Sequence, residues 1–145
     1  MQVKDAMTPH AEWISPDVPL TEVATIMRDK GIGCLPVGEN DRLIGMITDR
    51  DITCRAVASG SDPKRCKARD VMSKGITWCF EDQEIDDAAH LMEQKQVHHL
   101  PVMNRAKRMV GIITLGDLAL RGSQSVYSEV RKLASRDASR HTQTH

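Results

Sequence analysis

Two short stretches of this 145-residue chain carry residues that could hold a nucleotide. Gly45–Asp51 and Gly111–Asp117 both read glycine, two apolar residues, threonine, two variable residues and aspartate. Each stretch predicts a short buried strand that ends at the threonine and is followed by a helix. The free N–H groups and the positive dipole at a helix start attract an anion such as phosphate. An ionised aspartate only accepts hydrogen bonds, so it suits the two hydroxyls of a ribose.

The same residues also have a purely structural interpretation. Threonine followed three residues later by aspartate, ahead of an apolar helix, is a capping box, in which the side chains satisfy backbone N–H groups that lack a helical partner. One copy alone would favour the cap. Two copies in equivalent places strengthen the nucleotide-binding interpretation without removing the cap.

The elements that position these turns are themselves duplicated. Asp5–Thr8 matches Asp70–Ser73, and Leu35–Val37 matches Leu100–Val102 at the same spacing. From the glycine of each turn onward the spacing is one residue longer, and the extra residue falls in a polar, turn-like stretch. The chain therefore contains two copies of one unit.

Each copy predicts a β-α-β-β-α unit, which places the protein in the α+β class. A short strand, around Trp13–Ile14 in the first copy, leads to a helix with one apolar face, and two strands precede the closing helix. The apolar helix faces consist of Leu20, Val23, Ala24 and Met27 in the first copy and Ile85, Ala88, Ala89 and Met92 in the second. The paired strands are predicted at Cys34–Val37 with Leu43–Ile47, and at Leu100–Met103 with Met109–Ile113.

The two copies are expected to pack as a pseudo-twofold pair, because a unit of about 60 residues buries too little surface to be stable alone. The predicted domains are residues 1–62 for the first repeat, 63–122 for the second and 123–145 for a C-terminal tail. The tail should begin as a helix, since Val126, Val130 and Leu133 have helical spacing. From Ser135 onward it has no apolar pattern and should be disordered.

Composition argues against several classes of function. Twenty basic and twenty acidic residues leave a formal charge of zero, so no overall field attracts nucleic acid or an anionic membrane. Aromatic residues make up 3%, which is too few for stacking along a single nucleic-acid strand. The charged start lacks the apolar run of a signal peptide, and no later stretch has transmembrane length, so we expect a cytoplasmic protein.

Metal binding and catalysis find little support in the sequence. The four cysteines have no C-x-x-C spacing, which argues against a zinc knuckle or a dithiol redox motif. His98 and His99 are neighbours on a predicted strand and point to opposite faces, so they cannot easily bind one ion together. Asp49 and Asp51 lack a converging group for acid–base chemistry. We expect a protein that is not an enzyme and requires no metal or cofactor.

Three motifs, each present twice and in the same order, closely resemble those of the CBS domain, the module named after cystathionine beta-synthase. They are Asp-x-Met-[Thr/Ser], the Leu-Pro-Val strand and the Gly-x-Ile-Thr-x-x-Asp turn, and the resemblance covers residues 3 to about 122. Two such domains in tandem form a Bateman module. The resemblance implies a compact pair with two clefts for AMP, ATP, NAD(H) or S-adenosylmethionine, and a homodimer of two such pairs.

The resemblance also implies which residues line the two clefts, with threonine and aspartate of each turn contacting phosphate and ribose. One cleft would consist of Met46, Thr48, Arg50 and Asp51 facing Ile76, Thr77, Val97, His98 and Pro101. The other would consist of Ile112, Thr114 and Asp117 facing Ala11, Glu12, Ile32, Gly33 and Pro36. Gly116 stands in place of Arg50 and Gly33 in place of His98. The Asp51 cleft would therefore have two extra phosphate donors and should bind more tightly.

The leading functional hypothesis is a stand-alone, non-catalytic regulatory module that binds an adenine nucleotide between the repeats. It would pass the resulting change to a protein target in trans. The alternative is a ligand-free structural or stress-response interaction module, whose Thr-x-x-Asp turns serve only as caps. Nucleotide should stabilise the first and leave the second unchanged.

Overall fold

The computed structural model describes residues 1–10, 13–121, 130–133 and 135. The chain divides into two compact units. The continuous unit is one uninterrupted stretch, Glu12–Ile76, and the discontinuous unit joins Met1–Ala11 to Thr77–His145. Both units combine helices with paired strands, which confirms the predicted α+β class.

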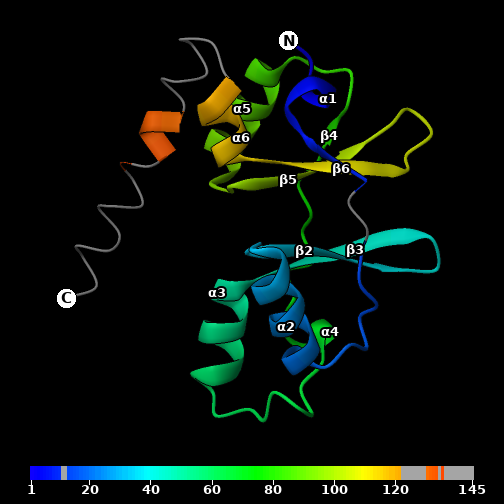
Figure 1. The fold of residues 1–145 in the computed structure, drawn as a ribbon, viewed down its shortest axis with the longest axis vertical. Coiled ribbons are helices and arrows are strands. Elements are labelled where there is room, and N and C mark those ends of the chain that lie inside the picture. The colour runs from blue at the N-terminus through cyan, green and yellow to red at the C-terminus, as the bar shows by residue number, and fades with distance from the viewer. Residues whose placement is uncertain (11–12, 122–129, 134, 136–145) are drawn as a thin grey trace. The chain divides into compact units, whose positions relative to one another are not determined.

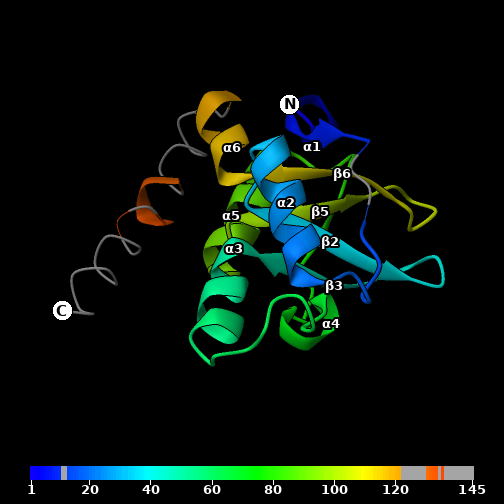
Figure 2. The ribbon, with the colours of Figure 1, turned by 60° about the horizontal axis from the view of Figure 1, so that its bottom comes forward.

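A two-stranded antiparallel hairpin forms the sheet of the continuous unit, and its helices lie on one side of that hairpin (Figure 1). β2 pairs with β3 from Cys34 opposite Thr48 to Glu39 opposite Arg42. The apolar side chains of hairpin and helices share one core, in which Leu20, Val37 and Ile47 are fully buried. The elements are α2 (Leu20–Lys30), β2 (Cys34–Glu39), β3 (Arg42–Thr48), α3 (Asp49–Asp51), the π-helical η1 (Ile52–Val57) and α4 (Ala68–Val71). Figure 2 shows α3 and η1 as one continuous helical segment.

The discontinuous unit has a four-stranded sheet in the order β1-β6-β5-β4. Its elements are α1 (Val3–Ala6), β1 (Thr8–Pro9), β4 (Cys79–Phe80), α5 (Ile85–Lys95), β5 (His99–Met103), β6 (Met109–Thr114) and α6 (Leu115–Arg121). Residues 130–133 are helical, and Leu133 is 1% exposed and packs in the core with Met92, Leu100 and Ile113. Val130 and Leu133, two of the three residues on which the predicted tail helix rests, lie in this helical segment. Val126 and residues 136–145 lie outside the described residues.

The amphipathic helices α2 and α5 form as the spacing of apolar residues predicts. Val23 and Met27 on α2, and Ala88 and Met92 on α5, are buried against their own sheets. Gly31 ends α2 with φ 63° and ψ 37°, left-handed values that glycine adopts without strain. The apolar face thus packs the helix against its sheet, and the Gly31 cap ends it.

The strand predicted around Trp13–Ile14 is reduced to a single parallel bridge from Ile14 to Val37. Its counterpart β4 pairs with β5 at two positions, and the Glu81 N–H donates to the Met103 carbonyl at 2.9 Å. Pro16 stands at the position equivalent to Glu81 and has no N–H to donate. Proline therefore stops the first-copy strand after one pair.

The short helices α1 and α4 open the two repeats, and the sequence analysis did not predict them. Each packs in the unit that holds the rest of the other repeat. Ser73, which follows α4, bridges to Met46 of β3, and Thr8, which follows α1, pairs with Ile112 of β6. The compact units thus cut across the sequence repeats, and the division between residues 62 and 63 lies inside the continuous unit.

The glycine of each Gly-x-Ile-Thr turn makes this exchange sterically possible. A Cβ atom on Gly111 would lie 2.5 Å from the Thr8 carbonyl oxygen and 2.8 Å from Met7 Sδ. On Gly45 it would lie 2.7 Å from Met72 Sδ. The glycine of the motif therefore has a packing role, because the residues that follow α1 or α4 lie directly against it.

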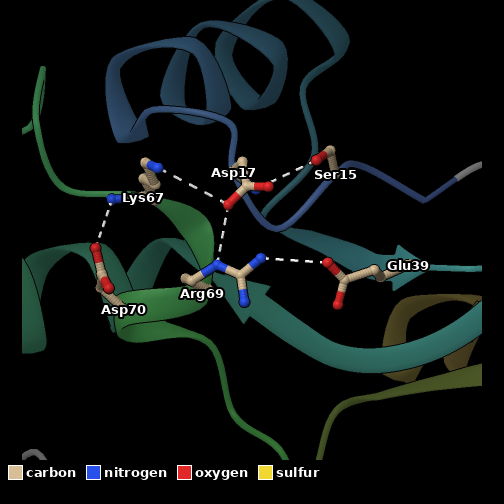
Figure 3. A network of polar contacts seen from close by, with 6 residues as sticks. All are labelled: Ser15, Asp17, Glu39, Lys67, Arg69 and Asp70. Carbon is tan, nitrogen blue, oxygen red and sulfur yellow. Dashed lines mark hydrogen bonds and ion pairs between the residues drawn. The ribbon is translucent and has the colours of Figure 1, made fainter.

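A polar cluster on the surface fastens α4 to the rest of the continuous unit (Figure 3). Arg69 of α4 donates from Nε to Asp17 Oδ1 at 3.0 Å and from Nη2 to Glu39 Oε1 at 3.3 Å. Lys67 Nζ lies 3.9 Å from the same Asp17 oxygen. The hydrogen bond from Arg69 is the main reason that the pKa of Asp17 lies below its ordinary value.

Candidate nucleotide-binding turns

Both Thr-x-x-Asp turns are complete capping boxes. In the first, the Thr48 N–H donates to Asp51 Oδ2 at 2.9 Å, and the Asp51 N–H donates to Thr48 Oγ1 at 3.1 Å. In the second, Thr114 and Asp117 make the same two bonds at 2.9 and 3.2 Å. The structural interpretation of the motif is therefore confirmed in both copies. It accounts for one oxygen of each aspartate.

The second carboxylate oxygen differs between the two turns. Asp51 Oδ1 lies 3.9 Å from Arg55 Nε, and the Asp51 side chain is 13% exposed. Asp117 Oδ1 has no hydrogen-bond or ion-pair partner among the residues that the structure describes. Each cap thus leaves one oxygen able to accept a hydrogen bond, and among the described residues an ion-pair contact within 4 Å is made by the oxygen of the first turn but not by that of the second.

The first N–H group of the helix has the same kind of partner in the two turns, and the second N–H group does not. The Asp49 N–H donates to the Gly33 carbonyl at 3.0 Å, and the Leu115 N–H donates to the His98 carbonyl at 2.9 Å. The Arg50 N–H donates to Asp49 Oδ1 at 2.9 Å. Leu115 has no polar side-chain atom, so the second turn has no equivalent of the bond from the Arg50 N–H.

The strand pairing determines which predicted site residues are neighbours. In the continuous unit, Pro36 pairs with Met46, and Gly33 contacts the start of α3. In the discontinuous unit, Pro101 pairs with Ile112. The continuous unit contains Met46, Thr48, Arg50, Asp51, Ile32, Gly33, Pro36 and Ile76, and the discontinuous unit contains Ile112, Thr114, Asp117, Val97, His98, Pro101 and Thr77.

Two of the predicted residues, Ala11 and Glu12, lie outside the described residues. Within the units, His98 is a neighbour of the Thr114 turn, because its carbonyl accepts from Leu115. Arg50 belongs to the Thr48 turn, so each turn has one of the two donors on which the predicted ranking of the clefts rests. The grouping of residues across the two repeats stays a prediction.

Sequence reasoning missed a pair of arginines that stand four residues after the two aspartates. Arg55 Nη1 donates to the carbonyls of Val71 and Met72 at 3.1 and 3.3 Å, and Arg121 Nη1 donates to the Asp5 carbonyl at 2.9 Å. Each arginine thus reaches from the closing helix to the short helix of the other repeat. The signal was in the sequence, since both arginines keep the motif spacing.

The buried cysteines are poor candidates for chemistry. Burial raises the pKa of Cys34 to about 12 and the pKa of Cys79 to about 12, so both remain neutral thiols near pH 7.

In the described part of the chain, no three His, Cys, Asp or Glu side chains gather closely enough to hold a metal ion. None of the described helices is both long and apolar enough to cross a bilayer.

The fold, the duplicated strand pair and the two capped turns define a tandem CBS protein. The sequence pattern of the CBS domain matches residues 3–56 and 68–122, so the chain belongs to the CBS domain family. These two matches confirm the predicted duplication.

Similar proteins of comparable length include CBS domain-containing protein YhcV of Bacillus subtilis (strain 168). It is 38% identical over 118 residues, which are 81% of this chain and 83% of that protein. The crystal structure of Hypoxic Response Protein I, with two coordinated zinc ions, is 34% identical, with a TM-score of 0.75, and the match covers 85% of this chain and 100% of that one. The CBS domain pair of MJ0100, in complex with 5′-methylthioadenosine and S-adenosyl-L-methionine, is 25% identical, with a TM-score of 0.73, over 83% of this chain and 94% of that one.

Proposed function

We propose that this protein is a non-catalytic regulatory module that binds an adenosine-containing ligand at its two Thr-x-x-Asp turns. The observation that carries the proposal is the geometry of the aspartates. Each uses Oδ2 for its cap and has Oδ1 left to accept from a ribose hydroxyl. The complex of the MJ0100 domain pair with two adenosine derivatives supports this class of ligand.

The apolar residues beside each turn suit the adenine. Met46 and Pro36 are paired on neighbouring strands of one unit, and Ile112 and Pro101 are paired in the other. Met46 and Ile112 are half-buried, and we expect their side chains to cover a face of the base, while a few polar groups fix its orientation. AMP, ATP, NAD(H) and S-adenosylmethionine all carry the adenosine that these residues would contact.

Binding can regulate only if the ligand favours one state of the protein over another. The proposed output is a change that a protein target in trans detects, with the module acting as a homodimer in the cytoplasm. The match to YhcV, which covers 83% of that protein, supports a regulatory module that consists mainly of the two CBS domains.

The second candidate is a ligand-free interaction module, and the completed capping boxes favour it. The two bonds in each box give the threonine hydroxyl and one aspartate oxygen a partner without any ligand. A thermal-shift screen with AMP, ATP, NADH and S-adenosylmethionine separates the two candidates. A specific ligand at a hundredfold excess over its Kd should add about 2.7 kcal/mol to the free energy of unfolding, whereas a pure scaffold should not respond.

Isothermal titration calorimetry on Asp51→Asn and Asp117→Asn tests the turns directly. Asparagine retains an oxygen that can accept the cap bond but removes the negative charge, so these variants separate ligand binding from capping. We expect a loss of affinity of about tenfold or more at the altered turn. Asp70→Asn is the matched control, because Asp70 Oδ2 accepts from the Lys67 N–H in a cap that is not a predicted site. Equal effects of all three substitutions, or none from the first two, would contradict the proposal.

A further inference from the structure

The Asp49 side chain occupies the start of its own helix. Its Oδ1 accepts from the Arg50 N–H at 2.9 Å, and a Cβ atom added to Gly33 would lie 3.1 Å from its Oδ2. The N–H groups of Asp49 and Asp51 donate to the Gly33 carbonyl and to Thr48 Oγ1. All three N–H groups of α3 therefore have an acceptor inside the protein.

A phosphate that approached this turn would meet an occupied donor and like charge. The Arg50 N–H is the α3 donor that is not bonded to a backbone carbonyl or to the capping threonine, and a carboxylate already accepts from it. Arg55 Nε lies 3.9 Å from Asp51 Oδ1, whereas the Asp49 carboxylate has no ion-pair partner among the residues that the structure describes. The Arg50 side chain is exposed and can attract an anion, but it does not free the N–H group.

The second turn lacks this arrangement. Leu115 and Gly116 stand where the first turn has Asp49 and Arg50, while Thr114 and Asp117 keep the same cap. The two turns thus share the groups that suit a ribose and differ in the group that meets a phosphate.

We propose that Asp49 is a specificity-determining residue, which makes the Thr48 turn favour uncharged or cationic adenosine derivatives over phosphorylated ones. The inference rests on the proposed adenosine-binding function and assigns a ligand class to one of its two turns. It reverses the predicted ranking for phosphorylated ligands, because the Arg50 turn then binds them less tightly than the Leu115 turn does.

The test measures the ratio of the Kd for AMP to the Kd for adenosine at the Thr48 turn by calorimetry, in the Asp117→Asn background, which weakens the second turn so that the two sites separate in the titration. Asp49→Leu installs the residue type of the second turn, and we expect the ratio to fall about tenfold or more, or about 1.4 kcal/mol. Asp49→Asn retains an acceptor for the Arg50 N–H and removes the charge, so it should lower the ratio less than Asp49→Leu does. Asp49 is exposed, so both variants should fold.

An unchanged ratio in Asp49→Leu, with adenosine still bound, would overturn the inference and leave the proposed function intact. Failure of both adenosine and AMP to bind the unaltered protein would instead reject the proposed function, and this inference with it. A Kd ratio near one in Asp117→Asn alone would also count against a role for Asp49 in discrimination.

Discussion

Asp17 and Asp82 are equivalent residues of the two repeats, and each pairs with an arginine from a different element. Asp17 accepts from Arg69 on α4, whereas Asp82 accepts from Arg105, in the turn between β5 and β6, through two bonds of 2.8 and 2.9 Å. Arg105 also lies over the Phe80 ring, 3.9 Å from its centroid. The aspartate is therefore retained while its partner changes.

The short helices that the repeats exchange are held in both units by the same two kinds of contact. A motif glycine lets the opening segment approach, and an arginine of the closing helix donates to its carbonyls. Only the continuous unit adds the Arg69 ion pairs, since Lys4 stands at the equivalent place on α1. The comparison shows that the close glycine contacts and the arginine hydrogen bonds to backbone carbonyls are common to both units. The surface ion pairs are an addition in one unit.

The glycine contacts should give the largest effects. Gly111→Ala would place a methyl group 2.5 Å from the Thr8 carbonyl oxygen, which cannot move without shifting β1, whereas Gly45→Ala meets the flexible Met72 side chain and, at 3.0 Å, the Ser73 carbonyl oxygen. Overpacking of this kind costs about 1–3 kcal/mol, so Gly111→Ala should lie near the upper value and Gly45→Ala near the lower. Urea unfolding measures both. Gly75→Ala is the control, because nothing lies within 4 Å of its added Cβ. A larger loss for Gly45→Ala would break the comparison.

The caps should contribute equally in the two units. Thr48→Val and Thr114→Val keep the shape of the side chain but remove the oxygen that accepts from the aspartate N–H, which should cost about 1 kcal/mol each. Thermal and urea unfolding provide the measurement. Thr48→Ser retains the hydroxyl and should recover most of the loss. Unequal costs would show that the two turns differ in stability as well as in charge.

The loss of stability should differ less between variants of the two arginines, Arg55 and Arg121, than between the two glycine variants. Arg55 donates to two carbonyls and Arg121 to one, so Arg55→Met should be the more costly change. A hydrogen bond from a partly exposed side chain contributes about 0.5–1.5 kcal/mol, and the difference between the variants should be about one such bond. Equal free energies of unfolding for Arg55→Met and Arg121→Met would refute this.

The surface ion pairs should have the smallest effect, visible mainly as a pH dependence. Hydrogen bonds from Arg69 and Arg105 lower the pKa values of Asp17 and Asp82. A lowered folded-state pKa contributes stability that is present above the unfolded-state pKa and is lost as the pH falls through the folded-state pKa. Asp17→Asn and Asp82→Asn should each flatten the loss of stability in acid, and salt should reduce the effect. An unchanged acid-side slope in either variant would show that its pair contributes nothing.

The sequence predicted the longer helices and strands, but it did not predict the short helices α1 and α4, which pack with the other repeat. Helices α2 and α5 and the strands β2, β3, β5 and β6 have periodic apolar patterns long enough to be read. Helices α1 and α4 have four residues each, which is too short for a 3.6-residue period to show. Which unit such a segment packs in depends on contacts distant in sequence, and no local pattern records those.

The candidate turns were predicted in part. The positions of Thr48, Asp51, Thr114 and Asp117 follow from the duplication, and the capping box was one of two interpretations that the pattern left open. For Asp49 the amino-acid pattern indicates no role beyond a possible acid or base that lacks a converging group. Its actual contact, with the N–H of the next residue, depends on a rotamer that the amino-acid order does not specify.

Because α1 and α4 each pack with the other repeat, the boundaries of the sequence repeats are not the places to divide the gene. A fragment that ends at residue 62 would keep the first hairpin but lose Ala68, Val71 and Met72, which fill its interior. The stretch from residue 12 to residue 76 retains them. Anyone who wishes to express half of this protein should therefore cut within the repeats and not between them.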